Sequence, residues 1–299
     1  MIRGIFYNSE KAQCSIYESG LMCYNALKQS DRYILDYTEE QVLYVDYDFA
    51  VFNQHVAVNN WMTNGILNEY KGKKYCIVLE VGQDDELMPL TPKIFDAYIV
   101  IDPSITDHSN VYGFPRPIEY YQTDSYIDRG YPTIGSFGFA TDGKRWGEII
   151  ELAQQDFDTA LVKINIPFAT YVTDSWQRTQ NIMLDIKSRI KKPGIRVELT
   201  HDYMNKEQLV RWCSRNTINY FPYYRNMHGL AAVTDQAISA KRPILVTTNP
   251  TFRHLFKYIK PYPNISLKDA IQENYQGVLK MNDDWSPANF CKKFESIIK

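Results

Sequence analysis

The sequence contains no long apolar segment. No window approaches the roughly 18 consecutive apolar residues that a membrane-spanning helix needs. The N-terminal stretch MIRGIFYNSEKAQ lacks the apolar core of a secretory signal peptide. Low-complexity tracts are also absent, and 44% hydrophobic with 23% charged residues is the composition of an ordinary globular protein. We therefore expect a soluble cytoplasmic protein without a membrane span.

Cysteine is scarce and unpatterned. The five cysteines are odd in number and widely scattered, and no Cys-x-x-Cys pair occurs, which argues against a disulfide framework and against cysteine-based zinc or redox chemistry. The cysteines lie mostly in apolar runs. All five are interpreted as reduced core thiols: Cys14, Cys23, Cys76, Cys213 and Cys291. No suitable loop carries an Asp-x-Asp motif and no His/Asp cluster has metal-ligand spacing, so neither a metal nor another cofactor is expected.

An excess of charge of one sign is missing as well. The 33 basic and 35 acidic residues give a formal charge of -2 and an isoelectric point near 6.2. Such a balance lacks the basic footprint of a nucleic-acid-binding protein, so nucleic acid is not expected as a partner. The short basic run at 187–196 is interpreted as a solvated helix end and loop.

Short β-branched or aromatic runs alternate with longer amphipathic segments along the whole chain. This alternation predicts an α/β protein in which helices cover parallel sheets. Strands are predicted at 2–6, 33–36, 49–52, 75–79, 97–101 and, weakly, 111–114, and then at 133–136, 160–164, 195–199, 218–221 and 244–246. Helices are predicted at 16–27, 144–155, 205–214 and 287–298.

The chain length of 299 residues favours two domains. Periodicity breaks between Pro115 and Pro132, where prolines and Arg129-Gly130 precede a new strand. We therefore predict an N-terminal Rossmann-like domain at 1–129 and a C-terminal one at 130–284. A last helix at 285–299 is expected to pack back on the first domain.

A strand that runs into a glycine-containing turn and then a helix lies at Ile134-Gly-Ser-Phe-Gly-Phe-Ala-Thr-Asp-Gly-Lys144. Glycines let the backbone approach a ligand, a helix N-terminus attracts anions, and Lys144 adds a full charge. The stretch is typical of an anion site, although a purely structural turn has the same pattern.

A second strand–loop–helix–strand stretch runs from Asn219 to Val246 and contains Pro-Tyr-Tyr-Arg. It predicts another helix N-terminus near His228 and Gly229. In a doubly wound sheet, loops at the carboxyl ends of the strands gather on one side, so the loops after Ile134 and Phe221 should converge on one ligand.

Together the two stretches resemble the C-terminal domain of retaining GT-B glycosyltransferases of family four. Gly-Ser-Phe-Gly-Phe-Ala-Thr-x-x-Lys is similar to the family's phosphate loop, with Lys144 in the place of the diphosphate-binding lysine. The resemblance covers residues 133–246. It implies a GT-B fold, with two Rossmann-like domains facing each other across a cleft, and metal-independent transfer of a sugar from a nucleotide-sugar donor with retention of configuration.

The sequence departs from the family at both glutamates of its Glu-(seven residues)-Glu helix, the second of which binds the ribose hydroxyls in the family. Gln236 stands where the second glutamate would be and His228 where the first would be. Both can still form hydrogen bonds with a ligand, although His228 could equally be an exposed or N-capping residue. The arginine usually paired with the lysine is absent from its place, and Arg145 is a candidate substitute.

The resemblance assigns candidate residues to the donor. The candidate donor-binding residues are Ser136, Gly138, Phe139, Lys144, Arg145, His201, Tyr203, Tyr223, His228, Gly229, Leu230 and Gln236. Among them, His201 and Tyr203 belong to the loop at 200–204, which is expected to contact the base. Lys144, His228 and Glu80 are the candidate catalytic residues. For Glu80 an ordinary strand-end carboxylate is the alternative.

The N-terminal half matches the family only in outline, as expected for the half that holds the acceptor. Its candidate acceptor-side residues are Ser19 and Gly20, in a loop predicted at 15–20, and His55 after a strand. The acceptor is expected to be a glycan, lipid or protein-linked hydroxyl, and the protein a monomer. GDP-mannose is favoured as donor, followed by a UDP-sugar.

Two alternatives remain open. A catalytically silent module that binds a nucleotide sugar or a glycan would account for the loss of both glutamates. The second alternative is a GT-B enzyme of other chemistry, such as an epimerase or an inverting transferase with His55 as general base.

Overall fold

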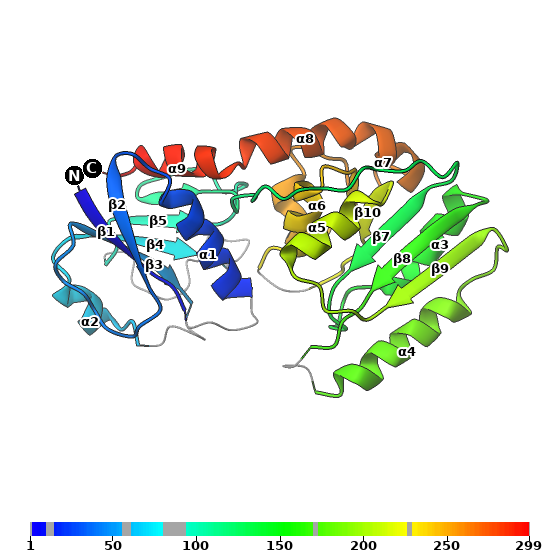
Figure 1. Ribbon diagram of the computed structural model, residues 1–299, viewed down its shortest axis with the longest axis horizontal. Coiled ribbons are helices and arrows are strands. Elements are labelled where there is room, and N and C mark those ends of the chain that lie inside the picture. The colour runs from blue at the N-terminus through cyan, green and yellow to red at the C-terminus, as the bar shows by residue number, and fades with distance from the viewer. Residues whose placement is uncertain are drawn as a thin grey trace. The chain divides into compact units, whose positions relative to one another are not determined.

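The computed structural model describes residues 2–9, 15–55, 61–79, 94–169, 173–225 and 229–298. The chain divides into two compact units, each with its own parallel sheet (Figure 1). Unit 1 comprises Met1–Glu119, His228–Leu230 and Asp284–Lys299, and unit 2 comprises Tyr120–Met227 and Ala231–Asp283. Residues 120–129 thus belong to unit 2, whereas the sequence places a boundary at residue 130. The α/β class predicted from the sequence is confirmed.

Unit 1 is built on a six-stranded parallel sheet in the order β2-β1-β3-β4-β5-β6. Its strands are β1 (Ile2–Tyr7), β2 (Tyr33–Thr38), β3 (Phe49–Gln54), β4 (Lys73–Val78), β5 (Ala97–Val100) and β6 (Val111–Gly113). Its helices are α1 (Ser15–Leu27), α2 (Asn64–Glu69) and α9 (Pro287–Glu295). The strand order reverses between β1 and β3, which is the switch point of this sheet.

The last helix completes the core of unit 1. Phe290 and Phe294 of α9 are buried in the same cluster as Cys23 and Ala26 of α1 and Phe49 of β3, and both helices run along this sheet (Figure 1). The amphipathic pattern of the C-terminal segment therefore buries its apolar stripe in unit 1. A separate cluster on the other face of the sheet includes Leu67 of α2.

Unit 2 contains a five-stranded parallel sheet in the order β11-β10-β7-β8-β9. Its strands are β7 (Thr133–Phe137), β8 (Ala160–Asn165), β9 (Ile195–Thr200), β10 (Ile218–Phe221) and β11 (Ile244–Val246). Its helices are α3 (Trp146–Asp156), α4 (Ser175–Ser188), α5 (Lys206–Ser214), α6 (Val233–Ser239), the 3-10 helix η1 (Pro250–Leu255), α7 (Leu267–Glu273) and α8 (Tyr275–Asp284), whose last residue passes into unit 1. The switch point lies between β7 and β10.

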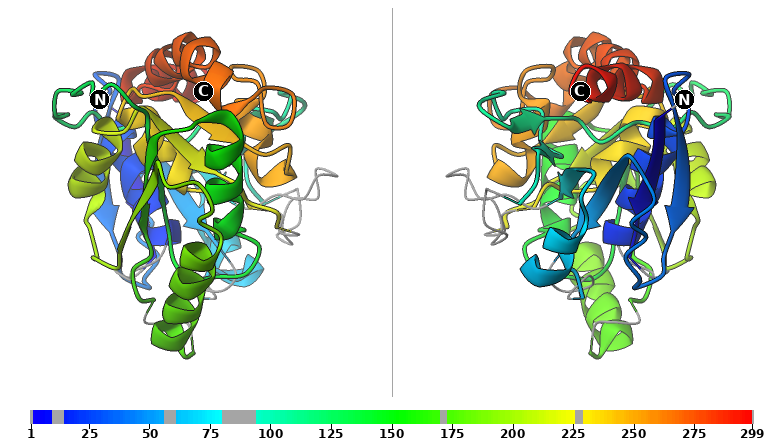
Figure 2. Two further views of the ribbon diagram at one scale, coloured as in Figure 1. Left: turned by 90° about the vertical axis from the view of Figure 1, so that its right-hand side faces the viewer. Right: turned by 90° about the vertical axis from the view of Figure 1, so that its left-hand side faces the viewer.

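Alternate residues of these strands face opposite layers. Ile134, Val162 and Tyr220 join a core with residues of α3, α4 and α7, and α3 and α4 lie along this sheet in Figure 2. On the other face, Phe137 packs edge-on against Trp212 of α5 with ring centroids 6.1 Å apart. Helices thus cover both faces of the sheet, as buried parallel strands require.

Every predicted strand has a counterpart, and the four described cysteines are buried free thiols: Cys23, Cys76, Cys213 and Cys291. Cys14 lies outside the described residues. Helix α4 was not predicted, because exposed Trp176 and Leu184, at 60% and 65% accessibility, disturb its apolar period. Within the described ranges no helix is long and apolar enough to cross a membrane.

Candidate functional site

The loop between β7 and α3 is shaped by three residues with positive φ. These are Gly138 (142°), Gly143 (77°) and Arg145 (43°). Glycine reaches such angles without strain, so the chain can double back within a few residues before α3 begins. Arg145 is the N-cap of α3 and provides no side-chain hydrogen bond to the helix. The predicted glycine-containing turn is therefore present at the C-terminal end of the central strand β7.

Lys144 lies buried in this loop. It is only 6% exposed, and its Nζ lies 5.6 Å from the centroid of the Trp146 ring and 5.3 Å from that of Tyr223. No carboxylate of the described residues forms an ion pair with it. Burial and, secondarily, the charge of Arg225 lower the pKa of Lys144 to about 7. A buried ammonium between two aromatic rings and beside another cation favours an anion as its counter-charge.

Gly138 leaves the space that this ammonium occupies. A Cβ atom on Gly138 would lie 2.6 Å from Nζ of Lys144 and 3.1 Å from the hydroxyl of Tyr223. Both distances are shorter than an ordinary contact. The glycine predicted as a donor contact is thus needed to accommodate Lys144 and Tyr223.

The loop after β10 is fastened to the loop after β7. The amide of Tyr224 donates to the carbonyl of Gly143 at 2.6 Å, and a Cβ on Gly143 would lie 3.0 Å from Cγ of Arg225. Thr247 Oγ1 donates to the carbonyl of Tyr223 at 2.5 Å. The two loops predicted to converge therefore do meet, at the switch point between β7 and β10.

Arg225 is absent from the sequence-predicted site. The sequence did contain an indication of its role, because Arg225 directly follows Pro-Tyr-Tyr in the predicted loop. What the sequence does not reveal is that this loop folds onto Gly143. Only the parallel pairing of β10 with β7 brings the two segments together.

Arg145 is held by other groups of unit 2. Its Nη1 lies 2.8 Å from Oε1 of Glu148, and its guanidinium stacks 4.0 Å from the ring centroid of Tyr224. Ser136 is fully buried in β7, and no described residue accepts or donates a hydrogen bond to its Oγ. Phe139 is half-buried in the loop. Of the predicted residues in this part of the chain, Ser136, Gly138, Lys144 and Tyr223 are the buried or sterically constrained ones.

The second helix start is not where the sequence places it. Helix α6 begins at Val233, with Ala232 as N-cap, rather than near His228 and Gly229. Just ahead of the helix, the amide of Ala231 donates to the carbonyl of Thr251 in η1 at 3.1 Å, a contact between distant segments that the local sequence does not indicate. His228 lies outside the described residues.

The remaining predicted residues near α6 are partly accessible. Gly229 and Leu230 are half-buried ahead of the helix. Gln236 lies within α6 and is also half-buried.

The predicted base-contacting loop follows the edge strand β9. His201 and Tyr203 are exposed, and the His201 ring lies 4.9 Å from that of Phe168. Asn165 fixes the loop, because it donates to the carbonyl of Asp202 at 3.0 Å and accepts from the amide of the same residue at 3.0 Å. This loop lies two strands away from β7 in the sheet order.

Ser19 and Gly20 lie in helix α1, as the helix predicted at 16–27 implies, so the loop predicted at 15–20 is wrong. Gly20 is in close contact with the strand ends: a Cβ there would lie 2.1 Å from Oδ1 of Asn8 and 2.3 Å from Nδ2 of Asn53. Ser19 is 3% exposed. The apolar period that marks the helix already starts at its first turn, so no loop separates it from these residues.

Hydrogen bonds close the switch point of unit 1. Nδ2 of Asn53 donates to Oδ1 of Asn8 at 2.7 Å and to the carbonyl of Ile16 at 3.1 Å. Asn8 in turn donates to the carbonyl of Tyr17 at 3.1 Å. These side chains tie α1 to the ends of β1 and β3, so their role here is structural. His55 follows β3 and is half-buried, whereas Glu80 lies outside the described residues.

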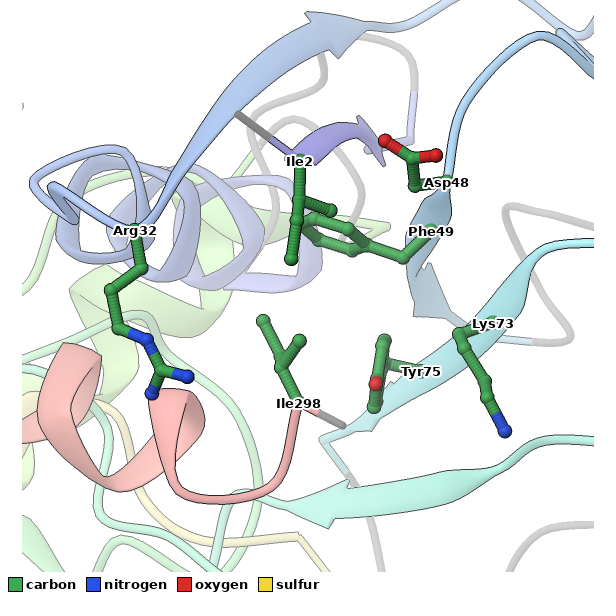
Figure 3. A pocket seen from close by; sticks show the side chains of 7 residues that line it. All are labelled: Ile2, Arg32, Asp48, Phe49, Lys73, Tyr75 and Ile298. Carbon is green, nitrogen blue, oxygen red and sulfur yellow. The ribbon is translucent and has the colours of Figure 1, made fainter.

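A hollow of about 530 Å³ lies at the opposite, amino-terminal edge of this sheet (Figure 3). Its lining residues are Ile2, Arg32, Asp48, Phe49, Lys73, Tyr75 and Ile298. The charged ones already have protein partners: Arg32 donates to the carbonyl of Glu295 at 2.8 Å and Lys73 pairs with Asp96 at 2.9 Å. The hollow includes none of the predicted site residues. Over the described part of the chain, no three His, Cys, Asp or Glu side chains cluster as metal ligands.

Sequence comparison finds no relative, since no protein-family model and no curated protein matches the chain. Solved structures do resemble it. The trehalose-6-phosphate protein from E. coli bound with UDP-2-fluoro glucose is 10% identical over 98% of both chains, with a TM-score of 0.63. Anabaena Alr3699/HepE in complex with UDP and glucose is 7% identical over 99% of both chains, with a TM-score of 0.61. An alpha-glucosyltransferase (AGT) in complex with UDP is 11% identical over 100% of both chains, with a TM-score of 0.55.

Identities this low establish the fold alone. The coverage spans nearly the whole chain and therefore both parallel-sheet units, and these structures have the GT-B fold. The resemblance drawn from the two motifs is thereby confirmed as a likeness of fold. The protein has the GT-B fold, with two Rossmann-like α/β units.

Proposed function

We propose that the protein is a glycosyltransferase that moves a sugar from a nucleotide-sugar donor to a hydroxyl acceptor, with retention of configuration and without a metal ion. The observation that carries this proposal is the buried ammonium of Lys144, which has no carboxylate partner among the described residues and lies at the switch point of a Rossmann-like sheet. Ligands of such sheets bind outside the carboxyl ends of the strands at this point.

The chemistry asked of Lys144 is stabilisation of the leaving group. As the glycosidic C–O bond breaks, negative charge develops on the nucleoside diphosphate. A cation that is already positioned and shielded from water lowers this barrier without reorganising. The N-terminus of α3 adds its dipole in the same loop, and its N-cap Arg145 offers no side-chain acceptor that would compete with a phosphate.

The donor's base is the open part of this proposal. The three similar structures hold UDP or a UDP-sugar derivative, whereas the sequence resemblance favours GDP-mannose. Both are therefore candidates. The acceptor is proposed to be a glycan, lipid or protein-linked hydroxyl, and the enzyme a cytoplasmic monomer.

A calorimetric titration with UDP and GDP, followed by the corresponding sugar nucleotides, tests donor binding. The Lys144→Ala variant should lose at least about tenfold in affinity, because a charge-assisted contact contributes roughly 1.5–3 kcal/mol. The control is Lys163→Ala, which removes another partly buried lysine of the same sheet that stacks on Trp212 at 4.9 Å. Unchanged affinity in Lys144→Ala would place the diphosphate elsewhere.

Turnover separates the proposal from its rival. Gln236 in place of a carboxylate favours a second candidate, a catalytically silent module that binds a nucleotide sugar. Binding of a sugar nucleotide with no release of nucleoside diphosphate across a panel of acceptors would support the silent module. Where product forms, NMR of its anomeric proton tests retention, and an inverted product would refute the retaining mechanism.

A further inference from the structure

Arg225 packs directly onto the phosphate loop. Its Cγ lies 3.0 Å from where a Cβ on Gly143 would be, and Gly143 immediately precedes Lys144. Hydrogen bonds on both sides fix the backbone here: Tyr224 donates to Gly143, and Nδ2 of Asn249 donates to the carbonyl of Arg225 at 3.1 Å. The stem of Arg225 thus starts from a defined point beside the buried lysine.

The charges of Arg225 and Lys144 act on each other. Among the residues that the structure describes, Arg225 is the charged group that lowers the pKa of Lys144, after burial itself. Two like charges held side by side cost free energy, and half-buried surroundings screen the repulsion less than water does. A bound dianion would offset that repulsion, which gives both cations a reason to be adjacent.

Arg145, the arginine nearest to Lys144 in the sequence, is engaged elsewhere. The ion pair with Glu148 satisfies its guanidinium on one side, and the Tyr224 ring covers its face. To reach a phosphate it would have to leave both partners. The like-charged neighbour of Lys144 is therefore contributed by the loop after β10 and not by the phosphate loop itself.

We propose that Arg225 is the second diphosphate-binding cation of this protein and replaces the arginine that its phosphate loop lacks. This inference rests on the proposed function. A guanidinium presents a planar set of donors that can bind two phosphate oxygens at once, whereas the lysine ammonium acts as a point charge. The pair would hold the donor's diphosphate from two loops that meet at the switch point.

Affinities of UDP and GDP, measured by calorimetry on the full chain, test the inference. Arg225→Gln should weaken the better-bound nucleotide by roughly 10- to 100-fold, and Arg225→Lys by less, since charged hydrogen bonds contribute about 1.5–3 kcal/mol. The affinity for the monophosphate of the same nucleoside should fall by a smaller factor in Arg225→Gln. Arg178→Gln is the matched control, because Arg178 also touches the phosphate loop, at Asp142 (3.2 Å), but from an exposed position.

The outcomes distinguish this inference from the proposed function. If the unaltered protein binds neither UDP nor GDP, the proposed function fails and the inference falls with it. If it binds and Arg225→Gln retains full affinity, the inference alone is wrong. A large loss in Arg145→Gln together with full affinity in Arg225→Gln would assign the role to Arg145.

A measurement on the ligand-free protein tests the charge pair directly. NMR titration of the labelled lysine side chains reports the pKa of Lys144. The signal of Lys144 is the one that is missing from the spectrum of the Lys144→Ala variant. Removal of the like charge in Arg225→Gln should raise that pKa toward its ordinary range. An unchanged pKa in a folded variant would show that the two charges are not adjacent and would overturn the inference.

Discussion

At the scale of single residues, the burial of Lys144 favours ligand binding but lowers the stability of the ligand-free protein. A bound anion would compensate the buried charge of Lys144. Without a ligand, the ammonium is buried and no carboxylate of the described residues pairs with it. Burial and Arg225 lower its pKa from 10.5 to about 7. The folded protein then binds fewer protons than the unfolded chain between these two values, so the free energy of unfolding rises with pH across this window.

Replacement of Lys144 by methionine should therefore stabilise the protein. At neutral pH the expected gain is on the order of 3 kcal/mol, because the cost of burying the charge disappears. Urea unfolding at several pH values from about 7 to 9 should show the wild type gaining stability relative to Lys144→Met as Lys144 deprotonates. Parallel curves for the two proteins would contradict this.

Binding of nucleoside diphosphate should have the opposite dependence on pH. Protonated Lys144 predominates below its pKa of about 7, so the affinity for UDP or GDP should fall as the pH rises above that value. Calorimetry across the same pH range measures it. The affinity of Lys144→Met should depend less steeply on pH than that of the wild type. An equally steep dependence would show that another group causes it.

Gly138→Ala should damage both the loop and the site. The φ of 142° strains any side chain, and its Cβ would displace Nζ of Lys144. We expect a loss of about 1–3 kcal/mol of stability from the backbone alone, and weaker UDP or GDP binding. Gly130→Ala is the control, since its φ is 73° but nothing lies within 4 Å of the added Cβ. Equal binding by the two variants would exclude a role for Gly138 in positioning Lys144.

At the scale of elements, the last helix is needed by the first sheet. Phe294 of α9 is fully buried and packs edge-on against Tyr75, with ring centroids 5.3 Å apart, and against Tyr33 at 6.2 Å. A helix from the far end of the chain thus covers strands from its beginning. The core of unit 1 consequently includes residues from both ends of the sequence.

Phe294→Ala should destabilise unit 1 by about 3–5 kcal/mol, as large-to-small changes of buried aromatic residues do. Lys292→Ala, on the exposed side of the same helix, should change stability by less than about 0.5 kcal/mol. Thermal or urea unfolding followed by circular dichroism compares them. If both variants unfold like the wild type, α9 contributes nothing to the core.

At the scale of the whole molecule, the proposed reaction depends on charges of the chain itself. We expect sugar transfer to persist unchanged when a chelator such as EDTA is present, because Lys144 and Arg225 rather than a metal ion would neutralise the diphosphate. The measurement is release of nucleoside diphosphate with and without chelator. Loss of turnover that returns on addition of Mg²⁺ or Mn²⁺ would contradict the metal-independent mechanism.

Most of the fold could be predicted because the local signals agree with it. Buried parallel strands are recognisable as short apolar runs, and the helices that cover them have an apolar stripe, as in α3 and α5. The start of α6 and the helix α4 were missed because these segments lack such a signal. The stretch ahead of α6 is joined to η1 by a hydrogen bond between Ala231 and Thr251, and α4 exposes apolar side chains.

The sequence by itself determined the α/β class and the glycine-containing loop that ends in Lys144, since both depend on neighbours along the chain. Only the tertiary structure decided that Lys144 is buried between Trp146 and Tyr223. It also decided that the charge of Arg225, from the loop after β10, acts on Lys144. The physical reason is that sheet order brings together loops far apart in sequence, and burial by those loops shifts the pKa of the lysine.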